Sequence, residues 1–123
     1  MHEFFLLLIL LGIFDSIYLT FFGSYFLNIL KSVQKTNIKI NYLGLVICYL
    51  VLAISIYYFG FIKKISEFDM FLLGFFIYSV YELVNYSTFN NWTIKMVVID
   101  SLWGGILYYI VYKIVKYVNV INK

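Results

Sequence analysis

This chain of 123 residues is too apolar for a water-soluble domain. Hydrophobic residues make up 64% of it and charged residues only 12%, whereas soluble domains hold roughly 45–50% and about 25%. One small core cannot bury that excess, so the surrounding solvent must be lipid. The net charge of +3 comes from lysines in loops and tails, which is ordinary for a membrane protein and gives no reason to expect nucleic-acid binding.

Four apolar segments follow one another, each near the ~20 residues that a helix needs to cross the hydrocarbon. They cover about residues 4–30, 42–62, 70–88 and 94–117. Short polar connectors join them, and short connectors place successive helices antiparallel. The sequence therefore predicts an all-α integral membrane protein, with residues 1–123 forming a single transmembrane domain. Its expected architecture is a four-helix up-down-up-down bundle.

The first segment carries Asp15 about eleven residues from its start, which is ~17 Å down and near the centre of the bilayer. Tyr18 shares its helical face. Gly12, Ser16 and Thr20 recur at a spacing of four, a pattern that lets helices approach closely in lipid. We therefore expect the first and last segments to pack together through these small residues, with Ser101 and Gly105 as their counterparts.

The third segment places Glu82 at a similar depth to Asp15, with Asn85 one turn deeper. Tyr78 and Tyr81 flank this glutamate. The second segment, by contrast, carries no motif. In the fourth segment Asp100 enters from the opposite face, ~9 Å from it, and is expected at the level of Asn85, with Trp103 on its own face.

Three acids inside spanning segments demand an explanation, because each costs about 2.5–3.5 kcal/mol near the bilayer centre and no basic residue lies beside them in the sequence. We expect them to turn toward one another and away from lipid. The candidate ion- or substrate-binding residues are Asp15, Tyr18, Tyr78, Tyr81, Glu82, Asn85, Asp100 and Trp103. Other aromatic residues, Tyr42, Trp92, Tyr108, Tyr112 and Tyr117, fall near segment ends and are expected in an interfacial belt.

Several functions fit such an acidic band. Carboxylate and amide oxygens suit protons, Mg²⁺, Ca²⁺ or an organic cation, so a transport site is one interpretation. Protonated acids that bridge helices as structural glue are the alternative. The acids could also meet a basic residue of another subunit. An enzyme fits less well, because His2 is the only histidine and no catalytic motif is present. We predict no cofactor beyond a hard cation at the acids, and the lipid bilayer as partner; several copies of the chain could associate.

The segments around two of the acids also echo each other. Residues 14–18 and 99–103 both read apolar, Asp, Ser, apolar, aromatic. Since the two helices run in opposite directions, an inverted repeat of the kind found in some transporters is one interpretation. Coincidence in an apolar background is the other.

Lysine distribution gives a weak indication of orientation. Lys63, Lys64, Lys113, Lys116 and Lys123 share a side with the N-terminus, and Lys31, Lys35, Lys39 and Lys95 face the other. Five against four favours cytoplasmic termini in a cell membrane. Such near balance is also typical of a protein that inserts in both orientations.

The same polar residues carry a family resemblance. Asp15-x-x-Tyr18, then Tyr78-x-x-Tyr81-Glu82-x-x-Asn85, then Trp92-x-x-Lys95, then Asp100-x-x-Trp103-Gly104 follow in order along the chain. They resemble the motifs of an uncharacterised family of small four-helix membrane proteins found mainly in bacteria. Glu82 stands where that family more often has Asp. The resemblance implies the four-helix fold and supplies no activity. The small multidrug exporters are similar to this chain in size, and they also carry an acidic residue midway along the first helix. This chain differs from them because it has two further acids and lacks their motifs.

Overall fold

The computed structural model describes residues 2–34 and 41–121, and the regular elements in those ranges are all helices. Helix α1 covers His2–Gln34, α2 covers Tyr42–Ile56, α3 covers Glu67–Thr88 and α4 covers Ile94–Ile121, while a short π-helix, η1 (Tyr57–Ile62), continues α2. The predicted all-helical class is confirmed. Helices α1, α3 and α4 extend beyond the predicted bounds, because apolar composition marks only the part of a helix suited to lipid, whereas backbone hydrogen bonding continues into polar ends.

Three of these helices are long and apolar enough to cross a membrane. They are α1, α2 with η1, and α4. Helix α3 is not among them. It has 22 residues, but these include the acidic residues Glu67, Asp69 and Glu82. Apolar side chains cover much of the exposed surface; Phe21, for example, is 76% exposed. A surface of this kind is expected where the surrounding solvent is lipid.

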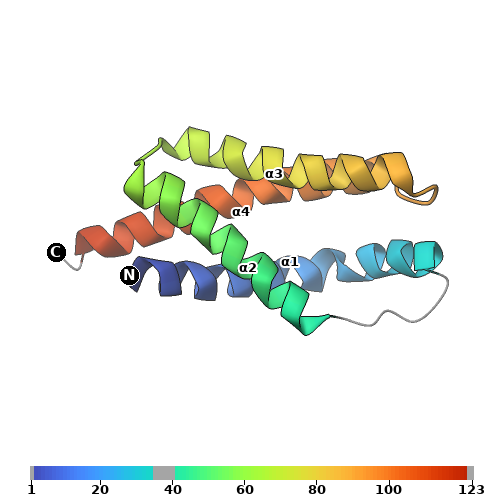
Figure 1. The fold of residues 1–123 in the computed structure, drawn as a ribbon, viewed down its shortest axis with the longest axis horizontal. Coiled ribbons are helices and arrows are strands. Elements are labelled where there is room, and N and C mark those ends of the chain that lie inside the picture. The colour runs from blue at the N-terminus through green and yellow to red at the C-terminus, as the bar shows by residue number, and fades with distance from the viewer. Residues whose placement is uncertain (1, 35–40, 122–123) are drawn as a thin grey trace.

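The helices alternate in direction (Figure 1). Helices α1 and α3 run one way, α2 and α4 return, and both ends of the chain lie near the connection between η1 and α3. Helices α3 and α4 lie side by side along most of their length, whereas α2 crosses α1 obliquely.

Glycines let α3 and α4 approach closely. A methyl group at Gly74 would overlap the carbonyl oxygen of Gly104, and one at Gly104 would overlap the ring of Tyr78. The predicted contact between α1 and α4 is present, but the small residues of α1 do not form it. Gly12 has no neighbouring group within 4 Å, and the exposed Ser16 donates to the carbonyl of its own helix.

Polar caps define the helix starts. Asn41, Ser66 and Thr93 each accept a hydrogen bond from the backbone N–H three residues later, which satisfies one free donor at the start of α2, α3 and α4.

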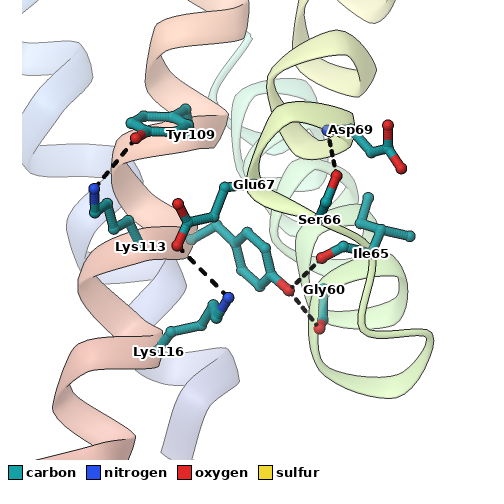
Figure 2. Close-up of polar contacts among 9 residues, drawn as sticks. Gly60, Ile65, Ser66, Glu67, Asp69, Tyr109, Lys113 and Lys116 are labelled. Atoms are coloured by element: carbon teal, nitrogen blue, oxygen red, sulfur yellow. Dashed lines mark hydrogen bonds and ion pairs between the residues drawn. The ribbon is translucent and has the colours of Figure 1, made fainter.

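A second set of polar contacts joins the ends of η1, α3 and α4 (Figure 2). Tyr112 Oη lies 3.0 Å from the carbonyl oxygen of Gly60 in η1 and 2.8 Å from that of Ile65 in the connection to α3, and its hydroxyl donates toward both oxygens. Lys116 Nζ lies 3.6 Å from a Glu67 oxygen. These contacts tie α4 to the connection between α2 and α3.

Two apolar cores fill the bundle. The larger core lies toward the chain ends and comprises Leu7, Leu11, Leu52, Ala53, Ile56, Met70, Leu107, Tyr108, Val111, Tyr112 and Val115. The smaller core lies near the connection between α3 and α4 and comprises Ile29, Trp92, Met96 and Val97. Along both α1 and α4, the residues between these cores include the predicted acids.

We predict that Gly74→Ala lowers the stability of the folded protein by about 1–3 kcal/mol, since the added methyl group forces α3 away from α4. Gly12→Ala is the matched control, because its methyl group meets open space, and its stability should be unchanged or higher by up to about 1 kcal/mol. Unfolding in detergent, followed by circular dichroism, measures both. Equal effects of the two substitutions would contradict the close contact.

Candidate intramembrane acidic site

The site is a layer of polar side chains between the two apolar cores. Asp15 lies in the middle of α1, Glu82 lies near the end of α3, and Asp100 lies in the second turn of α4. Glu82 is fully buried, Asp100 is 9% exposed, and Asp15 is half-buried. Within the described ranges, no ion pair joins a lysine to any of them. The layer therefore carries acidic groups with no basic counterpart.

Helices α1 and α4 exchange hydrogen bonds reciprocally in this layer. Trp103 Nε1 donates to Asp15 Oδ1 at 2.9 Å, and Tyr18 Oη donates to Asp100 Oδ1 at 3.0 Å. The two donor rings stack on each other, with centroids 4.7 Å apart and planes 6° apart. The two echoing sequence segments thus contact each other, and each aspartate is held by the aromatic residue of the opposite segment.

A third helix contributes to the same site. Tyr49 of α2 donates its hydroxyl to Asp15 Oδ2 at 2.6 Å, so both oxygens of Asp15 accept hydrogen bonds from neutral groups. Tyr49 was missed by the sequence analysis, because α2 carries no motif and nothing in its apolar pattern distinguishes this tyrosine from the others. This bond ties α2 to the contact between α1 and α4.

A cavity of about 160 Å³ opens at this layer. All four helices contribute to its lining, and aromatic rings form much of its wall. The lining residues are Asp15, Tyr18, Leu19, Phe26, Tyr49, Tyr78, Asp100 and Trp103. Five of the eight predicted site residues therefore surround one space.

Glu82 lies behind Asp100 and pairs with it. The two carboxyl groups are close enough to interact electrostatically, and the register of α3 and α4 places Asp100 nearer the level of Glu82 than the expected level of Asn85. Glu82 precedes the end of α3 by six residues, and Asp100 follows the start of α4 by six. Since α3 and α4 are antiparallel neighbours joined by a short turn, equal distances from that turn bring the two acids to one level.

Two neighbouring carboxyl groups repel each other when both are ionised, because carboxylates offer only acceptor oxygens. Glu82 Oε1 accepts a hydrogen bond from Trp92 Nε1 at 2.8 Å. Glu82 Oε2 is buried and receives no N–H or O–H donor from the protein in the part described.

Trp92 belongs to the site and not to an interfacial belt. It is 3% exposed and packs among the residues of the smaller core. Tyr108 and Tyr112 are buried as well, so the belt prediction is wrong for these three and fits the exposed Tyr42 and Tyr117. Proximity to a helix end does not determine which way a ring points. The Trp-x-x-Lys motif was the one indication in the sequence that Trp92 is special.

The remaining predicted residues lie at different distances from the acids. Tyr78 lines the cavity, and its ring covers Gly104. Asn85 is half-buried and does not line the cavity, and Tyr81 is 55% exposed on the outside of α3. In the ranges that the structure describes, no three His, Cys, Asp or Glu side chains are close enough together to hold a metal ion.

We predict that Tyr18→Phe destabilises the protein by about 0.5–2 kcal/mol, the range for hydrogen bonds inside membrane proteins. The substitution removes the donor to Asp100 and keeps the ring that stacks on Trp103. Tyr86→Phe is the control, because Tyr86 is exposed on α3 and should tolerate the loss of its hydroxyl. Unfolding by a denaturing detergent compares the two, and equal stability of both variants would contradict a stabilising role for the bond to Asp100.

Comparison with known proteins supports the membrane-protein class. Residues 1–115 match the DUF2177 family, whose members are described as predicted membrane proteins. No curated protein and no solved structure matches the chain. Because the match covers nearly the whole sequence, including every residue of the acidic layer, the chain belongs to the DUF2177 family of predicted membrane proteins.

Proposed function

We propose that this protein is a four-span membrane transport protein whose acidic layer takes up and releases protons or small cations. In this proposal α3 is the fourth span, since it packs against α4 along its length, and the bundle runs up-down-up-down through the membrane. The paired carboxyl groups of Glu82 and Asp100, buried without a basic partner, carry the proposal.

The Glu82–Asp100 pair supplies the proton-binding part. A shared proton makes the pair singly charged, and one further proton makes it neutral. The free-energy cost of burying the Glu82–Asp100 pair in the membrane therefore differs between its protonation states. Helices α3 and α4 can respond to that difference, because each carries one member of the pair.

The cavity beside Asp15 supplies the cation-binding part. It offers carboxylate oxygens of Asp15 and Asp100 and the faces or edges of several aromatic rings. Aromatic faces attract weakly hydrated cations such as ammonium groups. Mg²⁺ and Ca²⁺ need more oxygen ligands, about six to eight, so a monovalent or small organic cation fits this lining better.

Structural glue is the second candidate, and one observation favours it. Asp15, Glu82 and Asp100 each accept a hydrogen bond from an aromatic side chain of another segment. Such bonds alone could hold the bundle together, with the acids never changing their state. The transport and structural-glue candidates predict different effects when the acids are replaced by neutral amides.

We predict that Asp15→Asn and Asp100→Asn, made separately, abolish pH- or cation-dependent flux in proteoliposomes while the protein still inserts. The reason is that an amide keeps the shape of the acid and cannot exchange a proton or balance a cation. Asp69→Asn is the matched control, because Asp69 is exposed at the start of α3, and its flux should equal that of the parent.

Parallel stability measurements separate the two candidates. Lost flux with retained folding supports transport. Unchanged flux together with reduced stability of both variants would overturn the transport proposal and favour structural glue.

We also propose that the protein lies in a cell membrane with both ends of the chain on the cytoplasmic side. Lys63 and Lys64 lie between η1 and α3, at the same end of the bundle as Lys113 and Lys116. Lys31 lies at the other end with Lys95. Lys35, Lys39 and Lys123, which also entered the prediction, lie outside the described residues.

A reporter that is active only in the cytoplasm, fused after residue 123, should therefore be active, and a periplasmic reporter at the same place should be inactive. Comparable activity of both reporters would instead indicate insertion in two orientations.

A further inference from the structure

A polar cavity lies at the end of the bundle, between the start of α1, the end of α4 and the connection from η1 to α3. Its volume is about 670 Å³, within the ~300–1,000 Å³ of typical ligand pockets, and it shares no lining residue with the cavity of the acidic layer. The aromatic rings of Tyr57, Phe61 and Tyr112 form part of its wall. Its polar lining residues are His2, Glu3, Lys64, Ser66, Lys116 and Asn119.

This cavity lies where lipid headgroups are expected. The apolar span formed by α2 and η1 ends at Ile62, and the lining residues Lys64 and Ser66 follow it directly. On α4, Lys116 Nζ lies 4.9 Å from the centre of the Tyr112 ring. Lysine and tyrosine both concentrate at the ends of membrane helices, because each has an apolar body and a polar tip. A ligand in this cavity therefore has its polar group at headgroup level.

Lys64 is held in an unfavourable backbone conformation. Its φ is 56°, and it is the only non-glycine residue with a positive φ among those that the structure describes. Glycine adopts this left-handed conformation at little cost, whereas a residue with a side chain does so rarely. Strained residues of this kind cluster at ligand clamps. Here the side chain that the strain brings into place lines the cavity, and it forms no ion pair within the described ranges.

The charges around the cavity are mixed. Lys116 Nζ lies 3.6 Å from an oxygen of Glu67 (Figure 2), and a carboxylate oxygen of Glu3 lies 3.4 Å from His2 Nδ1. The lysines Lys64 and Lys116 are thus balanced by two carboxylates, with His2 neutral. Such a site suits a ligand that carries both signs of charge better than a purely anionic one.

We propose that this cavity binds the phosphoethanolamine headgroup of a membrane phospholipid. Lys64 donates to the phosphate oxygens, and the carboxylates of Glu3 and Glu67 accept from the ammonium group. Soluble phosphoethanolamine carries the same charges. The position of the cavity at the end of the apolar spans and its aromatic wall favour the lipid, whose acyl chains then remain in the surrounding hydrocarbon.

Lipid retention tests the headgroup and the lysine. Native mass spectrometry of the delipidated protein should show several-fold stronger binding of phosphatidylethanolamine than of phosphatidylcholine, which has no N–H donor, or phosphatidylglycerol, which has no amine, all with the same acyl chains. Lys64→Gln should weaken phosphatidylethanolamine binding by about 3–10-fold, as expected for one partly exposed charged contact. Lys63→Gln is the matched control, because Lys63 lies over the Tyr58 ring and does not line the cavity. Equal binding of the three lipids, or equal loss in both variants, would overturn the proposal.

A second variant separates binding from folding. Lys64→Gly relieves the backbone strain, so it should be at least as stable as the parent toward unfolding in detergent and should still lose the preference for phosphatidylethanolamine. Parent-like binding by Lys64→Gly would show that the side chain has no role. Binding of soluble phosphoethanolamine without retention of the lipid would overturn the lipid as the source of the headgroup. None of these readouts depends on transport through the acidic layer.

Discussion

The structure depends on the reciprocal contact between α1 and α4, in which Trp103 donates to Asp15 and Tyr18 donates to Asp100. Two hydrogen bonds and one stacked ring pair join helices that are far apart in the sequence. In lipid, apolar side chains gain little by leaving the surrounding hydrocarbon, so directional contacts of this kind determine which helices meet and in which register. A shift of one residue along either helix would break both bonds.

Around that contact, close packing of α3 against α4 decides the position of the third acid. The glycine contact between these helices fixes their distance, and the short turn between them fixes their register. Together they place Glu82 next to Asp100, while Trp92 closes the layer from the end near the turn. Apolar cores lie on both sides of the layer, so the protonation state of the buried acids matters for folding and for any transport function.

Composition and periodicity determined the class, the helical segments and the identity of the acids, because a helix in lipid must be apolar along its length and any charged residue stands out. Helical spacing also grouped Asp15, Tyr18, Asp100 and Trp103, which meet in the structure. It could not identify Tyr49 or the burial of Trp92, because an aromatic residue in an apolar helix has the same local pattern whether it faces a neighbour or lipid. The contact between α1 and α4 was expected to use the small residues Gly12 and Ser16, which do not form it, since glycine and serine at a spacing of four occur on both exposed and buried faces. Only the tertiary structure decided these points, because it fixes the rotation of each helix about its axis and the register between helices that are distant in sequence.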